Sequence, residues 1–183
     1  MAKQKFHDTK LFQTGLRLST KLKMLQTYVW SIMKYGSETW GSTQAIKDRV
    51  NAFEMWCYRR ILKIPYTAHR TNVDVLQQLR TDMKLNTIID RQRLRYIGHV
   101  LRGSSGSELR QLLVDTLSQK NVGRGRRKTF WFDDAWKIVA NDANRDTKLT
   151  LLIKRAAKRD LWRQSVWEYT AIEPTLNPED GPT

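Results

Sequence analysis

Cysteine and histidine are scarce in this chain of 183 residues. Cys57 is the single cysteine, which excludes a disulfide framework and any zinc site built on two or more thiolates. The three histidines, His7, His69 and His99, lie far apart in the sequence, so a metal site made of histidines alone is not expected. We therefore predict no metal ion and no other cofactor.

Long apolar runs are also missing. No stretch approaches the roughly 18 to 20 consecutive apolar residues of a membrane span. The N-terminal residues Met1 to Lys5 are not followed by the apolar core of a signal peptide. The sequence therefore predicts a nuclear or cytoplasmic protein that is not secreted and has no membrane partner.

The motifs of common enzymes are absent as well. The chain has no Gly-x-Ser-x-Gly elbow, no phosphate-binding glycine loop ending in Lys-Ser/Thr, and no His-Glu-x-x-His helix. Trp131 to Asp134 imitates the Asp-Asp turn of polymerases, but two-metal catalysis needs a further carboxylate from another strand. We interpret Asp133 and Asp134 as first-turn acids of a helix, and Cys57 as a core thiol. No catalytic residue is predicted.

Positive charge is what the chain has in excess. Its 33 Lys and Arg residues against 18 Asp and Glu give a formal charge of +15. Such an excess indicates a polyanionic partner, and both nucleic acid and an anionic membrane surface fit that charge. The chain also holds seven Trp residues, whose rings either fill a core or stack on bases. We expect most of them in the core.

Apolar residues recur at helical spacing along most of the chain, which predicts an all-α fold. In the helix expected over 86–102, Gly98 indicates either a close helix contact or simple tolerance, and Arg93 lies inside the apolar arc without explanation. A disordered tail is expected after residue 173. One continuous apolar stripe is expected from Ile46 to Ile64. The expected helices cover about 19–36, 43–64, 72–79, 86–102, 107–117, 130–139 and 147–169, with Ser19 and Asn72 as expected caps and Gly36 as an expected stop.

Three groups of basic residues are candidate nucleic-acid-binding sites. At about 100° per residue, one group shares a narrow arc of a helix; another lies in a glycine-containing loop, and the last on the final helix. The loop has alternative explanations as a solvated linker or a nuclear-import signal. No recognition-helix or zinc-finger signature is present, which favours phosphate contacts over base readout. The groups are Arg91, Arg95, His99 and Arg102; Arg124, Arg126, Arg127 and Lys128; and Lys154, Arg155 and Lys158.

Four blocks, in order and spacing, resemble the region downstream of the polymerase palm in non-LTR (LINE-like) retrotransposon endonuclease/reverse transcriptases. They cover roughly residues 10–136, and RDLWR at 159–163 extends the similarity. The family usually has a proline between the arginines of the fourth block, where Arg126 and Arg127 are adjacent here. The blocks are TKLK (20–23) to YGSETW (35–40); AFEMWCYRR (52–60) with LKI (62–64); RLRYIGHV (93–100); and GRRKT (125–129) with Asp133-Asp134.

The resemblance implies a thumb-like helical bundle followed by a smaller basic helical segment, which grip the template-primer duplex in such enzymes. The catalytic palm of the parent RNA-directed DNA polymerase would lie before Met1, so the chain alone is not expected to be catalytic. Its implied partners are RNA or DNA, bound through phosphates, and the missing palm. The predicted divisions are an N-terminal segment (1–18), the thumb-like bundle (19–103), a linker (104–128), a C-terminal helical segment (129–172) and the tail (173–183).

Two other hypotheses compete with a nucleic-acid-binding fragment of a reverse transcriptase. One is a domesticated helical module that docks a partner protein through a Trp-bearing surface, with its charge serving only solubility. The other is a segment that works only within a full-length polymerase and is unstable alone. Salt-insensitive association would favour the protein-docking module over the nucleic-acid-binding fragment. A broad, non-cooperative melt would identify a segment that is unstable alone.

Overall fold

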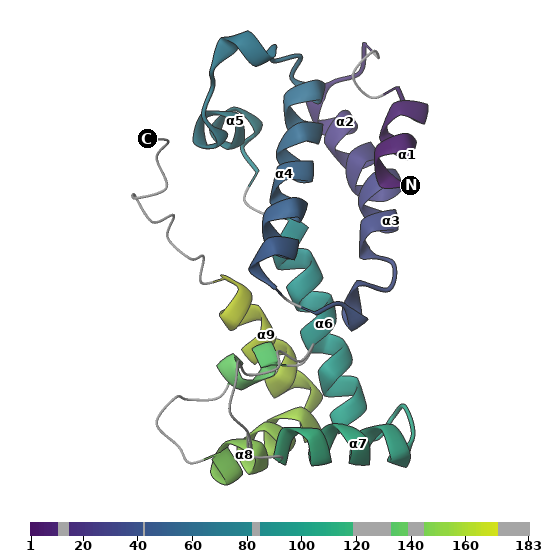
Figure 1. Cartoon of the computed structure of the whole chain (residues 1–183), viewed down its shortest axis with the longest axis vertical. Helices are drawn as coiled ribbons and strands as arrows, with labels where there is room; N and C mark the ends of the chain where they lie inside the picture. The colour runs from purple at the N-terminus through teal and green to yellow at the C-terminus, as the bar shows by residue number, and fades with distance from the viewer. Residues whose placement is uncertain (11–14, 42, 82–84, 119–132, 139–144, 172–183) are drawn as a thin grey trace. The chain divides into compact units, whose positions relative to one another are not determined.

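The computed structural model describes residues 1–10, 15–41, 43–81, 85–118, 133–138 and 145–171, and the regular elements among them are all helical (Figure 1). This confirms the predicted all-α fold. The chain divides into compact units at Met1–Ile89 and Asp90–Thr183. The division falls inside helix α6 (Leu85–Leu101), whereas the sequence predicted a boundary after residue 103. The predicted tail and residues 119–128 of the predicted linker lie outside the described residues.

Unit 1 (Met1–Ile89) contains the helices α1 to α5. The helix expected over 19–36 is interrupted by a π-helical turn at Leu25–Val29, and it starts after Arg17 instead of being capped by Ser19. Gly36 ends this stretch with a φ of 68°, as predicted from its freedom in the left-handed region. The helices are α1 (Ala2–Asp8), α2 (Leu18–Met24), α3 (Trp30–Lys34), α4 (Gln44–Ile61) and α5 (Asn72–Leu79), with 3₁₀ turns at Ser37–Thr39 and Tyr66–Ala68.

Side-chain caps explain where α4 and α5 begin. Thr43 accepts a hydrogen bond from the Ile46 backbone N–H and so caps α4. The sequence predicted that this helix begins near Thr43. At α5 the cap is Thr71, which forms a capping box with Asp74. The predicted cap, Asn72, is instead the first residue of that helix. Both helices thus begin within one residue of their predicted starts.

The core of unit 1 combines apolar side chains with one buried carboxylate. Leu25, Val29 and Trp30 pack with the predicted apolar stripe of α4, including Val50 and Cys57. Glu54, only 2% exposed, accepts hydrogen bonds from the Tyr58 hydroxyl at 2.8 Å and from the Leu85 backbone N–H at 2.9 Å. This carboxylate therefore links α4 to the start of α6.

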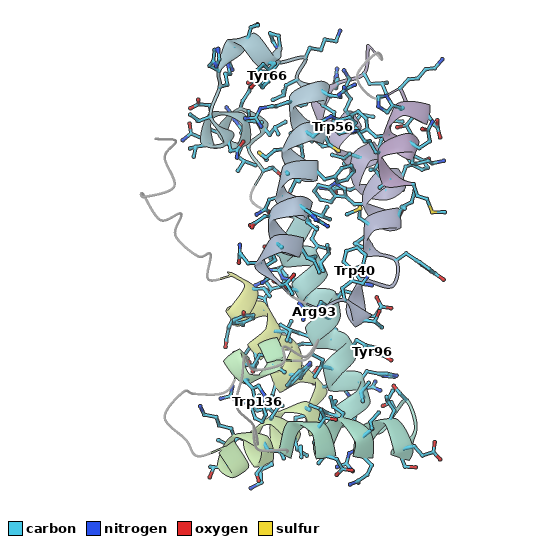
Figure 2. The ribbon with its side chains drawn as sticks, in the orientation of Figure 1. Trp40, Trp56, Tyr66, Arg93, Tyr96 and Trp136 are labelled. Atoms are coloured by element: carbon cyan, nitrogen blue, oxygen red, sulfur yellow. The ribbon has the colours of Figure 1, made fainter. Side chains whose placement is uncertain are left out.

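Trp56 on α4 anchors an aromatic group in unit 1 (Figure 2). Its ring meets Phe6 of α1 edge-on at 5.1 Å and lies stacked near Phe53 at 6.1 Å. The guanidinium of Arg60 and the amine of Lys3 lie over the Trp56 ring at 4.5 and 5.0 Å. Because Phe6 is fully buried by this packing, α1 joins the core although seven residues are too few to show a helical pattern in the sequence.

Unit 2 (Asp90–Thr183) contains the remainder of α6, α7 (Ser107–Ser118), a 3₁₀ helix at Asp133–Ile138, α8 (Arg145–Ala157) and α9 (Arg159–Ala171). The prediction of one helix over 147–169 is wrong, because the chain bends at Lys158. The bend lets Leu152 and Ala156 of α8 share a core with Trp162 and Val166 of α9. Tertiary packing thus overrides helical continuity. The start of the 3₁₀ helix at Asp133 agrees with our interpretation of Asp133 and Asp134 as a helix start.

Two features of α6 that the sequence left open have structural explanations. Gly98 packs directly beneath the buried ring of Trp162, which confirms a close helix contact. Arg93 is buried in the apolar arc, and its guanidinium forms an ion pair with Asp90 at 3.0 Å. A buried charge needs such a partner.

Trp162 and Trp30 are buried core residues, while Trp167 is 56% exposed.

Candidate nucleic-acid interface

Helix α9 runs alongside α6 in unit 2 (Figure 1). The indole N–H of Trp162 donates to the Leu94 carbonyl at 2.9 Å, near the middle of α6. Arg91 near the start of α6 contacts Thr170 near the end of α9. The far end of α6 lies near the start of α9, where Arg102 is close enough to Arg159 to be affected by its charge. The two helices are therefore antiparallel, and the predicted basic arc of α6 borders α9.

The structure separates the four residues of this arc by their surroundings. Arg95 and His99 are exposed, and the His99 ring lies stacked near Tyr96 at 6.4 Å. Arg91 is only 9% exposed, and Arg102 is half-buried. The sequence predicted that all four residues form one binding face. In the structure only Arg95 and His99 are exposed to solvent on that face.

Arg91 is held by contacts within unit 2. Its Nε donates to the Thr170 hydroxyl at 2.6 Å, and its guanidinium carbon lies 3.9 Å from the centre of the Trp167 ring. Burial lowers the pKa of Arg91, and the positive charge of Arg95 lowers it further. These contacts tie α6 to α9 and fix the orientation of the Trp167 ring.

Arg102 combines a structural contact with a strongly positive setting. Its Nη1 donates to the Ala156 carbonyl at 2.9 Å, one of the last carbonyls of α8. Such carbonyls lack partners inside their own helix. Burial lowers the pKa of Arg102, and the nearby charges of Arg159 and Arg163 lower it further. Three guanidinium groups thus gather where α6 ends and α9 begins.

Arg159 and Arg163 belong to this site although the sequence analysis did not select them as binding residues. Both are exposed and lie four residues apart, so they share one face of α9. Arg163 has an exposed carboxylate nearby, at 3.7 Å on Asp160, whose side chain is 98% exposed. The four-residue spacing of Arg159 and Arg163 within the helix expected over 147–169 could have identified the pair from the sequence.

The predicted group on the final helix is divided by the bend at Lys158. Lys154 and Lys158 are exposed, whereas Arg155 uses Nη1 to donate to the Ile138 carbonyl at 2.7 Å. Lys158 directly precedes Arg159 and so adjoins the guanidinium group at Arg102. We name the resulting set the α6/α9 surface and define it as Arg95, His99, Arg102, Lys158, Arg159 and Arg163.

The third predicted group, Arg124, Arg126, Arg127 and Lys128, lies outside the described residues. Among the residues that are described, no set of three or more His, Cys, Asp or Glu side chains is arranged to hold a metal ion. In the same part of the chain, no helix has the length and apolar character needed to cross a membrane.

Cys57 is completely buried on α4. Burial raises its pKa to about 12, the negative charge of Glu54 raises it as well, and Arg60 acts in the opposite direction. The side chain is therefore a neutral thiol near neutral pH, and thiolates are the nucleophilic form of cysteine. These surroundings match those of a core residue, as interpreted from the sequence.

Comparison of the chain with protein-family models, with curated proteins and with solved structures finds no match in any of the three. The retrotransposon resemblance therefore stays a prediction from the sequence blocks. The α6/α9 surface is held together by the hydrogen bond from Arg102 to the Ala156 carbonyl, just before α9 begins at Arg159.

Proposed function

We propose that unit 2 binds nucleic acid by placing the sugar-phosphate backbone on the α6/α9 surface. The observation that carries this proposal is the hydrogen bond from Arg102 to the Ala156 carbonyl at 2.9 Å, which brings the Arg102 guanidinium to the end of α8, close to where the exposed Arg159 begins α9. Guanidinium groups match phosphate oxygens in geometry and charge. The surface is continued by Arg95 and His99 along α6 and by Lys158 at the bend.

The placement of these charges costs the free protein stability. The N-terminal end of a helix carries a partial positive charge, so Arg159 in the first turn of α9 is unfavourably placed. Arg102 adds a further like charge, and Asp160 is too exposed to offset all of them strongly. A bound polyanion would relieve this repulsion, which is why we assign a binding role to the group.

Contacts to phosphate position a protein on nucleic acid without selecting a sequence. The α6/α9 surface consists of cationic side chains, most of them exposed, on helices that also pack on each other. We therefore propose binding that tolerates sequence and falls steeply with salt.

The resemblance to retrotransposon reverse transcriptases supports a more specific form of the proposal. In that form the chain is the thumb and downstream part of an RNA-directed DNA polymerase, and the ligand is the template-primer or an RNA–DNA duplex. The catalytic palm would then be a partner of this chain. The RDLWR block at 159–163 contributes both arginines of α9 to the surface, so the resemblance and the geometry meet at these residues.

Fluorescence anisotropy with a labelled RNA–DNA hybrid, measured across a salt series, tests the proposal. Each phosphate contact on a B-form duplex contributes roughly −0.9 to the log-log slope of affinity against salt. The variant Arg95→Gln/Arg159→Gln/Arg163→Gln removes three exposed charges, so its slope should be shallower by about 2.7 if all three contact phosphates. Arg102 is left intact because it also bonds Ala156.

The matched control is Lys23→Gln/Arg49→Gln/Lys63→Gln, which removes three exposed charges from unit 1. Its slope should stay near that of the unmodified chain. Absence of binding at about 50 mM salt, or equal losses in both triple variants, would refute an interface on α6 and α9. A salt-insensitive association with proteins instead of nucleic acid would favour the interaction-module hypothesis.

A further inference from the structure

Trp167 is an exposed aromatic residue beside the cationic α6/α9 surface. Its side chain is 56% exposed, whereas Trp30 and Trp162 are each only 2% exposed. Leaving a large ring in water forgoes the free energy of burying it. The surface around Trp167 is therefore a candidate for ligand binding.

The ring of Trp167 has one occupied face. The guanidinium carbon of Arg91 lies 3.9 Å from the ring centre, so Arg91 covers that face. Because more than half of the side chain is nevertheless exposed, the accessible area consists of the opposite face and the ring edge. An incoming planar group would stack on the opposite face, giving a layer of guanidinium, indole and ligand.

The ring is held in place before any ligand arrives. Arg91 donates to the Thr170 hydroxyl at 2.6 Å, and that hydroxyl in turn donates to the Val166 carbonyl at 2.8 Å. The stacked guanidinium is thereby anchored to α9, the helix that carries Trp167. Preorganisation of this kind reduces the conformational entropy lost on binding.

The charges around Trp167 indicate the chemistry of the ligand. Arg163 lies one helical turn before Trp167 on α9, so the two side chains share a face. Arg95 lies one turn after Arg91 on α6 and is exposed. The nearest acid in sequence, Glu168, accepts a hydrogen bond from Gln164 at 2.8 Å. An aromatic platform next to exposed arginines fits a nucleotide, whose base stacks while its phosphate pairs with a guanidinium.

A protein ligand fits this neighbourhood less well. Docking of an apolar helix or strand needs a contiguous apolar patch. Here Arg163 lies one turn before Trp167 and Arg91 is stacked on its ring, whereas the exposed Leu161 lies about 120° away around α9. Bases inside a duplex already stack on each other, so a free ring face selects unpaired nucleotides.

We infer that the α6/α9 surface takes unpaired nucleotides as well as phosphates, with one base stacked on the open face of Trp167. This inference rests on the proposed function, because the same surface supplies the phosphate contacts. It adds a preference for single-stranded RNA or DNA segments, independent of base identity because every base has a π-face.

The test compares single strands with and without bases. An oligothymidylate of about 12 nucleotides and an abasic strand of the same length carry the same phosphates but differ in their bases. The full chain should bind the oligothymidylate roughly tenfold more tightly, a difference of about 1.4 kcal/mol. Trp167→Ala should abolish this difference while leaving affinity for the abasic strand and its salt slope unchanged.

Two further variants separate stacking from folding. Trp167→Phe keeps a ring and should retain most of the preference for the strand with bases. Leu161→Ala removes another exposed apolar side chain of α9, 47% exposed, and should leave that preference intact. Circular dichroism melts identify any variant that does not fold.

The outcomes distinguish the two proposals. Equal affinity of the unmodified chain for both strands, with a steep salt slope, would overturn stacking on Trp167 and leave phosphate binding in place. An equal loss of affinity for both strands in the Trp167→Ala variant would also overturn stacking on Trp167. Failure to bind the abasic strand and the hybrid duplex at about 50 mM salt would overturn the proposed function itself.

Discussion

Gly98 of α6 lies directly against the ring of Trp162 of α9. A Cβ atom built on Gly98 would lie within 2.6 Å of the Cδ1 and Cε2 atoms of the Trp162 ring. The ring cannot withdraw easily, because it is buried and its N–H donates to the Leu94 carbonyl at 2.9 Å. The absence of a side chain at residue 98 thus sets how closely the two helices approach.

Gly98→Ala should therefore destabilise the protein. Alanine gains about 1 kcal/mol of helix propensity over glycine, but overpacking a buried contact typically costs about 1–3 kcal/mol. We expect a net loss of up to about 2 kcal/mol in the free energy of unfolding from urea titrations. Gly41→Ala is the control, because a Cβ there meets nothing within 4 Å. A Gly98→Ala variant more stable than the unmodified chain would contradict this packing.

The buried carboxylate of Glu54 should make an unusually large contribution to stability. Glu54→Leu leaves the Tyr58 hydroxyl and the Leu85 N–H without this acceptor, at a cost on the order of 3 kcal/mol. Glu54→Gln keeps one acceptor oxygen and should cost less, about 1–2 kcal/mol. Chemical denaturation measures both. The control Glu168→Gln changes an exposed residue and should stay within about 0.5 kcal/mol.

Stability should fall at alkaline pH. The fold raises the pKa of Cys57 from 9.0 to about 12, through burial first and then the charge of Glu54, and it raises the pKa of Tyr58 above its ordinary value of 10.0 for the same reasons. The folded chain therefore keeps protons that the unfolded chain releases. Each group contributes stability that is fully present below its unfolded pKa and is lost as pH rises toward its folded pKa.

We expect the unfolding free energy to decline from about pH 9 upward, by up to about 1.4 kcal/mol per pH unit for each group. In Cys57→Ala the decline should begin about one pH unit higher, because Tyr58 alone remains. Denaturant titrations over this pH range, each compared with the same variant at neutral pH, measure the effect. An identical onset in both proteins would contradict the assignment to Cys57.

Substitution of Arg91 should affect mainly the stability of the fold, whereas substitution of Arg95 should affect mainly the binding of nucleic acid. Arg91 is engaged with Thr170 and Trp167, so Arg91→Gln should lower the unfolding free energy by about 1–2 kcal/mol. Arg95 is exposed, so Arg95→Gln should leave stability within about 0.5 kcal/mol. On hybrid duplex, Arg95→Gln should reduce the salt slope by roughly 0.9 and Arg91→Gln should not. The reverse assignment would show that burial does not decide which arginine contacts phosphate.

Helical periodicity predicted most of the fold because each strongly periodic segment buries one face. The stripe from Ile46 to Ile61 and the stop at Gly36 are examples. The bend at Lys158 was not predictable in this way, since no proline or glycine marks it. It arises because residues on both sides share a core with Leu94 and Ile97 of α6.

The candidate site was predicted only in part, because it too depends on how the helices pack. Angular spacing placed Arg91, Arg95, His99 and Arg102 on one arc, but spacing alone does not tell which of them a neighbouring helix covers. Arg159 and Arg163 were missed as binding residues because only the packing of α8 and α9 on α6 brings them close to Arg102. Arg93 could be explained only once its ion pair with Asp90 was visible.

The π-helical turn at Leu25–Val29 has a consequence for how this segment tolerates changes in length. A π-bulge accommodates one residue more than a regular α-helix does over the same rise, and so preserves the rotational phase of the flanking turns. Deleting a single residue there would convert Leu18–Lys34 into an uninterrupted helix in which Trp30 still faces the core. Related chains that differ by one residue in this segment would therefore share the same packing on both sides of the gap.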